Sequence, residues 1–187
     1  MATTKVLEKE EALQVVSWMY ENGKELYGDV CTVMAALVLR VGDTVGLRMQ
    51  DIKRGEVLKV TEQKTGKVKE VEHIPEIVLQ IVEKRRAMYP NDSFLFTAHS
   101  NRASGMKGVS REEVTRNIKA AALACDITGT VGSHSLRKFG ASECYNATGK
   151  DLGMAMKVLN HSNIQTTMKY LRLDQKRIDS ALNSVWG

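Results

Sequence analysis

A histidine and an arginine stand three positions apart, at His134 and Arg137, within the run SHSLRKFGAS. Side chains at positions i and i+3 share one face of a helix, and Ser133 is a suitable N-cap for such a helix. Both side chains would then lie in the first turn, near the positive end of the helix dipole. An imidazole and a guanidinium placed there suit a phosphate oxyanion. The same pattern also fits a core histidine beside a surface arginine, and the pair alone leaves that alternative open.

A second histidine, His161, is followed after about two helical turns by Tyr170, in the run LNHSNIQTTMKYL. Asn160 or Ser162 would cap a helix that begins at residue 163. His161 would then lie just before the positive end of that helix. A plain capping turn followed by an interface tyrosine gives the same pattern, so this run alone does not define a site.

Arg40 directly follows a strongly apolar segment that is expected to be a buried helix. A guanidinium at the end of a buried helix costs free energy unless it is paired or binds an anion. Asp43 is the expected partner. A purely structural pair of Arg40 and Asp43 remains the alternative to an anion site.

The elements that must position these residues are mostly helices. Apolar residues recur with helical spacing in the N-terminal third, and valine-rich, partly alternating segments follow, separated by the turn-like residues 63–66. Pro75 opens the next helix, which runs to about Met88. The expected helices are 7–22, 25–39, 43–51, 75–88, 110–124, 134–147, 151–159, 163–171 and 174–185, with a hairpin of strands 56–62 and 67–74 and a short strand at 94–96. We therefore expect an α+β fold that is mainly α-helical, with one small antiparallel hairpin or sheet.

Composition narrows the class of protein. A chain of 187 residues with 43% hydrophobic and 26% charged residues is typical of one globular domain. Three cysteines, odd in number and far apart, exclude a disulfide framework and a CxxC metal site. The first 30 residues carry three basic and six acidic side chains, whereas the rest carry 24 and 16. This basic body indicates a polyanionic partner such as nucleic acid.

Four local strings, taken in order, resemble the tyrosine recombinases (phage integrase family). LRVGDTVGLRMQDI resembles the family's box around its first arginine, and EQKTGK resembles its hairpin lysine turn. SHSLRKFGAS resembles its His-x-x-Arg box, and VLNHSNIQTTMKYL resembles its histidine and nucleophile box. The similarity covers roughly residues 5–180. The catalytic set that it implies is Arg40, Lys64, His134, Arg137, His161 and Tyr170.

The resemblance also implies a role for each residue in DNA strand cleavage. Tyr170 would attack a phosphodiester and remain joined to it as a 3′-phosphotyrosine. The two arginines would stabilise the charge of the transition state. His134 would accept the proton of the tyrosine, and His161 would donate to a non-bridging oxygen. Lys64 would protonate the departing 5′-oxygen, with Lys67 as the competing candidate.

Partners and context follow from the same resemblance. It implies double-stranded DNA as partner and a tetramer that assembles on it, without metal, cofactor, ATP, small-molecule substrate or membrane. We expect residues 1–187 to form a single catalytic domain without the family's N-terminal core-binding domain. The helix at 174–185 would dock on its own domain or, as the family favours, on a neighbour. The expected location is the cytoplasm, either at the nucleoid or in a phage's host.

Other functions remain open at this point. A type IB topoisomerase shares the chemistry but acts within one duplex, and a catalytically silent DNA-binding module would use only the basic surface. A metal-dependent nuclease could use His134, His161 and Asp43, although clustered carboxylates are lacking. His73 and His99 have no partner spacing and are expected to be structural or surface residues.

Overall fold

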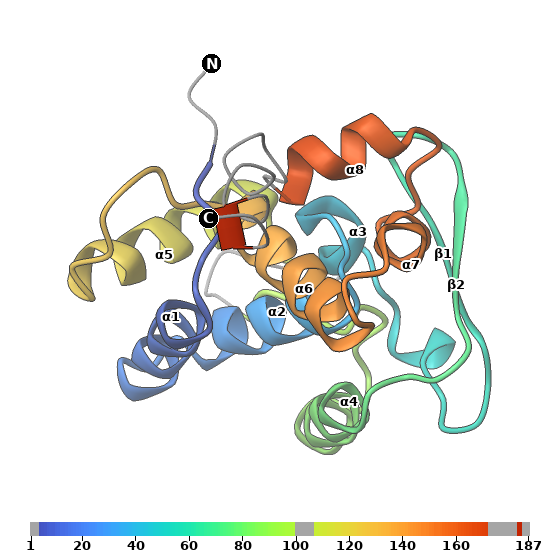
Figure 1. Ribbon diagram of the computed structural model, residues 1–187. Coiled ribbons are helices and arrows are strands. Elements are labelled where there is room, and N and C mark those ends of the chain that lie inside the picture. Colours follow the sequence, from blue (N-terminus) through green and yellow to red (C-terminus); the bar gives the residue numbers. More distant parts are fainter. Residues whose placement is uncertain (1–3, 100–106, 172–182, 185–187) are drawn as a thin grey trace. The chain divides into compact units, whose positions relative to one another are not determined.

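The computed structural model describes residues 4–99, 107–171 and 183–184 (Figure 1). They divide into two compact units, Met1–Gly140 and Ala141–Gly187. The helices are α1 (Lys9–Glu21), α2 (Glu25–Ala36), α3 (Val41–Val45), α4 (Glu76–Met88), α5 (Arg111–Ala124), α6 (Ser133–Ala147), α7 (Leu152–Val158) and α8 (Ile164–Leu171). A short 3-10 helix, Met49–Asp51, follows α3, and the strands are β1 (Leu58–Thr61) and β2 (Val68–Val71). The prediction of a mainly helical fold with a small antiparallel sheet is confirmed.

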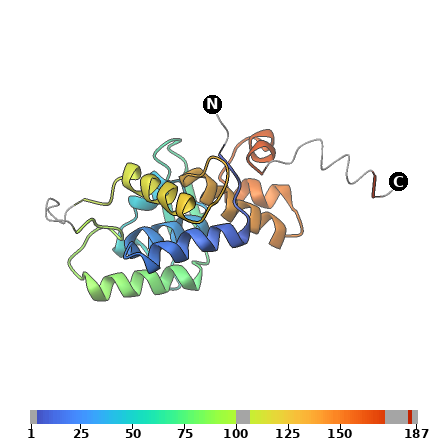
Figure 2. The same cartoon turned by 90° about the vertical axis from the view of Figure 1, so that its left-hand side faces the viewer.

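Helix α2 lies at the centre of the first unit. Its side chains are apolar around most of its circumference, and Val30, Val33 and Met34 are fully buried. Helices α1, α4 and α5 pack against it, as Figure 2 shows. A helix that is apolar all round must be covered on every side, so the position of α2 follows from its composition.

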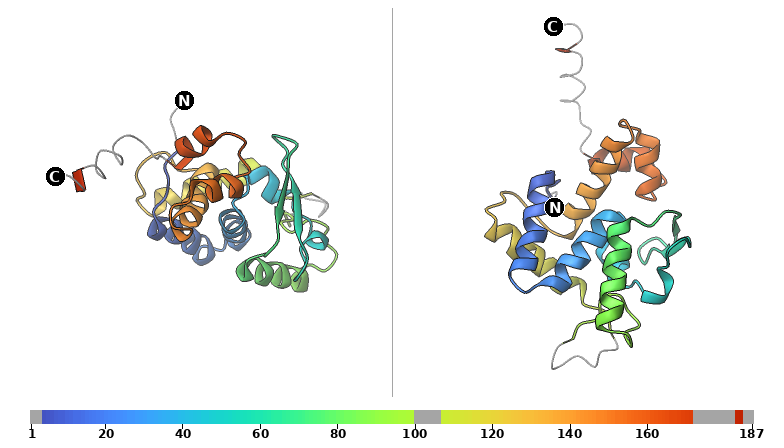
Figure 3. Two further views of the ribbon diagram at one scale, coloured as in Figure 1. Left: turned by 45° about the vertical axis from the view of Figure 1, so that its right-hand side comes forward. Right: turned by 90° about the horizontal axis from the view of Figure 1, so that it is seen from below.

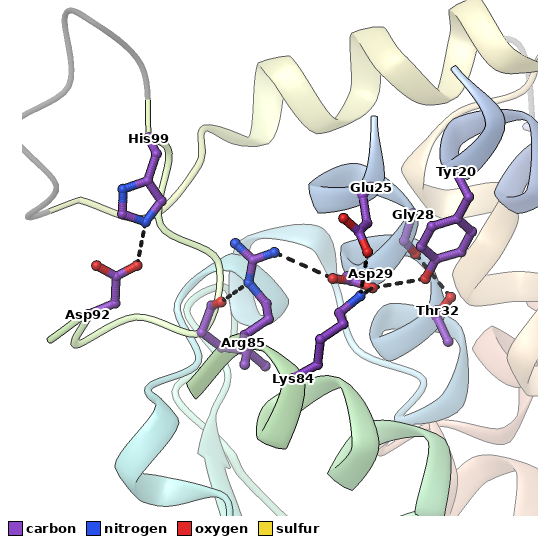
Figure 4. Close-up of polar contacts among 10 residues, drawn as sticks. Tyr20, Glu25, Gly28, Asp29, Thr32, Lys84, Arg85, Asp92 and His99 are labelled. Atoms are coloured by element: carbon purple, nitrogen blue, oxygen red, sulfur yellow. Dashed lines mark hydrogen bonds and ion pairs between the residues drawn. The ribbon is translucent and has the colours of Figure 1, made fainter. Parts of the chain in front are cut away.

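A buried carboxylate ties three of these helices together (Figure 4). Asp29 of α2 has no exposed surface, and its Oδ1 accepts hydrogen bonds from Tyr20 Oη of α1 at 2.9 Å and from Lys84 Nζ of α4 at 2.8 Å. Its Oδ2 lies 3.4 Å from Arg85 Nη1, and the Nε of Arg85 donates to the backbone carbonyl of Leu95 at 2.8 Å. Because every charge in this cluster has a partner, the cost of burying Asp29 is offset.

The two strands form an antiparallel ribbon, clearly seen in Figure 3, with Leu58 opposite Val71 and Thr61 opposite Val68. Along β1, Leu58 and Val60 are buried and alternate with exposed residues. A turn from Glu62 to Lys67 joins the strands, and Gly66 takes a φ of +69° there, which glycine adopts without strain. The predicted hairpin and its turn are therefore present, with strands shorter than expected.

The second unit contains the paired helices α7 and α8. The side chain of Asp151 accepts a hydrogen bond from the backbone N–H of Met154 and caps α7. The side chain of Asn163 accepts one from the backbone N–H of Gln165 at 2.8 Å at the start of α8. Asn163 therefore makes a hydrogen bond at the helix N-terminus that the sequence analysis did not expect from it, and the expectation for Asn160 or Ser162 stays a prediction.

Several predicted boundaries differ from the structure. The helix expected at 25–39 ends at Ala36, because Val38 takes a left-handed conformation. The helix expected at 43–51 is split into α3 and the 3-10 helix, and residues 94–96 form only an isolated bridge between Phe94 and Arg48. Ser133, which was expected to be the N-cap before the helix, is the first helical residue of α6.

Two expectations remain without a test. Most of the helix expected at 174–185 lies outside the described residues. The single-domain organisation of residues 1–187 stays a prediction. Within the described part of the chain, no helix has the length and hydropathy needed to cross a membrane.

The cluster around Asp29 leads to a stability prediction. Asp29→Ala leaves Lys84 and Arg85 without their buried counter-charge, so we expect a loss of about 3–5 kcal/mol in the free energy of unfolding. Glu25→Gln removes only the exposed partner of Lys84, 3.1 Å away, and is the matched control. Its expected loss is at most about 1 kcal/mol. Urea unfolding of both variants measures the difference, and equal losses would contradict a stabilising role for the cluster.

Candidate active site

A pocket of about 430 Å³ in the first unit is lined by four of the six residues singled out in the sequence. They come from separate segments: the chain before α3, the β1–β2 turn and the start of α6. The four are Arg40, Lys64, His134 and Arg137, and the lining also includes Asp43, Gln63 and Arg111. The structure thus brings two arginines, a lysine and an imidazole around one cavity.

The backbone before Arg40 is strained and firmly held. Val38 has a φ of +50°, a region that β-branched residues rarely adopt and that costs about 1–3 kcal/mol. The Nε of Arg137 donates to the carbonyl of Val38 at 3.2 Å, and Lys69 Nζ donates to the carbonyl of Leu37 at 2.6 Å. These hydrogen bonds hold the turn that delivers Arg40 to the pocket, and Arg137 lines the same pocket.

Close packing brings α6 onto the same segment. A Cβ on Gly140 would lie 2.1 Å from the carbonyl oxygen of Ala35, a distance that atoms in contact do not reach. Only glycine at position 140 allows α6 to approach the end of α2 this closely. The His-x-x-Arg helix and the arginine turn are therefore fixed against one another by their backbones.

Arg40 has a different main partner from the one expected. Its Nη1 lies 2.7 Å from Glu62 Oε1 and 4.0 Å from Asp43 Oδ2. The expectation that Asp43 is the partner is therefore incomplete, because Glu62 is the closer carboxylate. Strand alternation was the available signal: Glu62 continues the buried positions of Leu58 and Val60, and it is 1% exposed.

The turn that carries Lys64 is tied to α3. The backbone N–H of Gln63 donates to Asp43 Oδ1 at 2.9 Å, and its side-chain Nε2 donates to the carbonyl of Gly42 at 2.9 Å. Lys64 lines the pocket, whereas Lys67 is not among the lining residues. Of the two lysines left open by the sequence, Lys64 is the one that the structure places at the pocket.

The environment of His134 lowers the pKa of its imidazole. Partial desolvation lowers the pKa of His134, although the side chain is exposed on one side, and the charges of Arg137, Lys138, Lys64 and Arg40 lower it further. A neutral imidazole among cations can accept a proton at neutral pH.

Sequence reasoning missed Arg111. It is the first residue of α5, after the N-cap Ser110, and its side chain lines the pocket. It also lines a second cavity on α5, together with Thr115, Arg116, Lys119 and Glu112. The signal in the sequence was three cations spaced along the first turns of a helix that follows a polar loop.

The two remaining candidates, His161 and Tyr170, lie in the second unit. Their rings meet edge to face with centroids 5.6 Å apart. His161 Nδ1 lies 3.1 Å from Thr167 Oγ1, and Thr167 is fully buried. The histidine and the tyrosine of the last box are therefore close neighbours within their unit.

The other two histidines lie outside the pocket lining. His99 Nε2 is 2.7 Å from Asp92 Oδ2 (Figure 4). The ring of His99 stacks on Tyr89 with centroids 4.1 Å apart. His73 is exposed next to the end of β2. Within the described ranges, no group of three or more His, Cys, Asp or Glu side chains is arranged to hold a metal ion.

Comparison with known proteins places this site in a family. A model described as the phage integrase family matches residues 5–177. The chain belongs to that family. The probable integrase/recombinase YoeC of Bacillus subtilis (strain 168) is 31% identical over 149 residues, which cover 80% of this chain and 78% of YoeC.

Solved structures show the same fold. XerA recombinase aligns with a TM-score of 0.73 at 20% identity, over 100% of this chain and 67% of its own. A lambda integrase tetramer bound to a Holliday junction aligns with a TM-score of 0.71 at 18% identity. That alignment covers 91% of this chain and 49% of the integrase chain, so this chain spans about half of it. The fold is that of the catalytic domains of tyrosine recombinases.

The lowered pKa of His134 predicts how stability depends on pH. Because the folded protein binds this proton less readily than the unfolded chain, stability from His134 is present above the unfolded pKa of about 6.5 and is lost as the pH falls through the folded value. His134→Gln removes this dependence. We expect the wild type to lose more unfolding free energy than the variant between about pH 7.5 and about pH 5.5. Urea titrations at both pH values measure it, and identical losses would contradict the cationic environment of His134.

Proposed function

We propose that this chain is the catalytic domain of a site-specific DNA recombinase, which cleaves and rejoins strands through a 3′-phosphotyrosine intermediate without metal or ATP. The observation that carries the proposal is the pocket that gathers Arg40, Lys64, His134 and Arg137. Membership in the phage integrase family supports it. The steps below assign one task to each candidate residue.

The two arginines would bind the non-bridging oxygens of the scissile phosphate. Attack on a phosphodiester adds negative charge to these oxygens, and a guanidinium can donate two parallel hydrogen bonds to them. The Arg40 side chain is mostly covered and is paired with Glu62. Arg137 is buried, and its Nε donates to the carbonyl of Val38. Donors that are already oriented lose little entropy when the transition state forms.

Tyr170 would be the nucleophile and His134 the group that accepts its proton. A tyrosine hydroxyl with an ordinary pKa of about 10 is mostly protonated at neutral pH, so it needs a base. The lowered pKa of His134 leaves its imidazole free to act as that base. His161 would donate to a non-bridging oxygen, and its contact with the ring of Tyr170 supports a shared task.

Lys64 would protonate the 5′-oxygen that leaves. An alkoxide is a poor leaving group, so a general acid at this position speeds cleavage. The covalent link to Tyr170 retains the energy of the broken bond, and a 5′-hydroxyl of another strand can attack it. Strands are then rejoined without ATP, and the cations of the pocket supply the charge stabilisation that a metal ion provides in many nucleases.

Double-stranded DNA is the proposed partner, with self-association on it. The basic cavity on α5 adjoins the pocket through Arg111, which lines both. Side chains of this kind bind the phosphate backbone without sequence preference and make affinity strongly dependent on salt. The solved lambda integrase tetramer bound to a Holliday junction supports assembly into tetramers on DNA.

The central test is covalent capture. A pool of nicked duplexes with randomised sequence is incubated with the chain in EDTA, and covalent protein–DNA adducts are isolated and sequenced. A nick beside the cleaved bond lets the 5′-hydroxyl fragment diffuse away, which traps the adduct. We expect wild-type adduct, and none with Tyr170→Phe, which keeps the ring but lacks the attacking oxygen.

Matched variants define what the result means. Tyr145→Phe makes the same change at another tyrosine of the second unit and should form adduct normally. Arg40→Ala should slow adduct formation by about 10²-fold or more, the scale of one lost transition-state donor. Adduct formed by Tyr170→Phe would contradict the assignment of the nucleophile. Strand exchange between two captured duplexes distinguishes a recombinase from a topoisomerase, which would only relax supercoils.

A further inference from the structure

Glu62 is a buried carboxylate beside the pocket that has no chemical task of its own in the proposed cleavage. It is 1% exposed and stands at the end of β1, directly before the turn with Lys64. A carboxylate removed from water is costly unless other groups compensate its charge and its hydrogen bonds. The burial of Glu62 therefore depends on neighbouring groups that compensate its charge and its hydrogen bonds.

The two oxygens of Glu62 have different partners, one that lines the pocket and one in the turn that carries Lys64. Oε1 lies 2.7 Å from Arg40 Nη1, and Oε2 accepts a hydrogen bond from Thr65 Oγ1, one residue beyond Lys64. The backbone of Glu62 closes the same turn: its carbonyl accepts from the N–H of Gly66 at 2.8 Å, and its N–H donates to the carbonyl of Lys67 at 2.9 Å. One side chain thus joins the arginine to the lysine turn.

The charges around Glu62 keep it ionised. Burial alone would raise the pKa of the Glu62 carboxyl, but the hydrogen bond from Thr65 and the charges of Arg40 and Arg137 outweigh it and lower the pKa overall. On the neighbouring segment, Asp43 Oδ1 accepts a hydrogen bond from the backbone N–H of Gln63. An ionised Glu62 can fix one edge of the Arg40 guanidinium while the rest of that side chain lines the cavity.

We propose that Glu62 is a positioning residue that couples the orientation of Arg40 to the placement of Lys64 in the pocket. This inference rests on the proposed function, because it concerns the strand cleavage assigned to that pocket. Glu62 touches no reacting atom in this scheme. It acts through Arg40 on the charge of the transition state and through Thr65 on the lysine that protonates the leaving oxygen.

The two connections can be separated by substitution. Thr65→Val removes the hydroxyl that donates to Glu62 and that accepts from the backbone N–H of Lys67 at 3.3 Å. Thr65 is exposed, so we expect the variant to fold. Glu62→Gln keeps the shape of the side chain but removes its negative charge. The variant is therefore expected to weaken both the contact with Arg40 and the hydrogen bond with Thr65. Thr61→Val and Glu70→Gln make the same chemical changes elsewhere on the hairpin, at exposed positions on β1 and β2, and serve as controls.

The experiment measures single-turnover adduct formation on a captured nicked duplex, in two forms. One form has the normal 5′-oxygen at the cleaved bond, and the other has sulfur there. A thiolate, whose conjugate acid has a pKa of about 8.5, leaves without a proton and does not need Lys64. Lys64→Ala is the reference for loss of the general acid alone.

The expected pattern differs between the two variants. Thr65→Val should be about 10-fold slower on the oxygen duplex, because general acid catalysis is worth about 10²–10⁴-fold and is only partly lost. On the sulfur duplex it should return to within about 2-fold of wild type, as Lys64→Ala should. Glu62→Gln should stay about 10-fold or more slow on both duplexes, since a misplaced Arg40 costs charge stabilisation in each.

Each other outcome overturns the inference or the function beneath it. Glu62→Gln with wild-type rates on both duplexes, even with lowered stability, would show that the ion pair is only structural. Thr65→Val that is slow on both duplexes, or on neither, would refute the connection to Lys64, and this variant decides the question if Glu62→Gln does not fold. Wild-type protein that forms no adduct refutes the proposed function itself.

Discussion

The buried carboxylate of Glu62 and the partly covered guanidinium of Arg40 lie 2.7 Å apart at the base of the β1–β2 turn, and Arg40 lines the pocket. Neither charge is tolerable there alone, because an uncompensated ion in the protein interior costs several kcal/mol. Pairing fixes the strand end against the segment that follows α2. The same glutamate holds the turn with Lys64 in place. Hydrogen bonds from Gln63 to Asp43 and to the carbonyl of Gly42 hold it as well.

In the first unit, positively charged side chains are concentrated around one cavity. Arg40, Lys64, Arg111 and Arg137 line a cavity in which Asp43 is the carboxylate, and these cations lower the pKa of His134. Such a cavity favours an anion and keeps its imidazole available as a base. The strand cleavage proposed for this chain requires a bound phosphate, a base and an acid, and membership in the phage integrase family supports that proposal. Tyr170 and His161, the other residues in the proposed chemistry, belong to the second unit and are neighbours within it.

Much of this was predictable from the sequence, for reasons that are local. Helical periodicity located most of the helices, and the valine-rich alternation located the hairpin. Arg40, Lys64, His134 and Arg137 carried motif signals and do line one pocket. The end of α2 was placed too late, because Val38 adopts a left-handed φ that its β-branched side chain disfavours. Hydrogen bonds from Arg137 and Lys69, distant in sequence, hold that conformation. Glu62 and Arg111 were missed for the same reason, since their importance depends on contacts between distant segments.

The claim that Glu62 acts through Arg40 is tested most directly by a double-mutant cycle on cleavage. Adduct formation is measured for wild type, Glu62→Gln, Arg40→Ala and the double variant on the nicked duplex with sulfur at the cleaved bond, where the connection from Glu62 to Lys64 no longer affects the rate. If the glutamate works by orienting the arginine, removing it costs little once the arginine is gone. We expect the double variant to be within about 3-fold of Arg40→Ala, far from the product of the two single losses. Losses that multiply would contradict the coupling and show that the two side chains act independently.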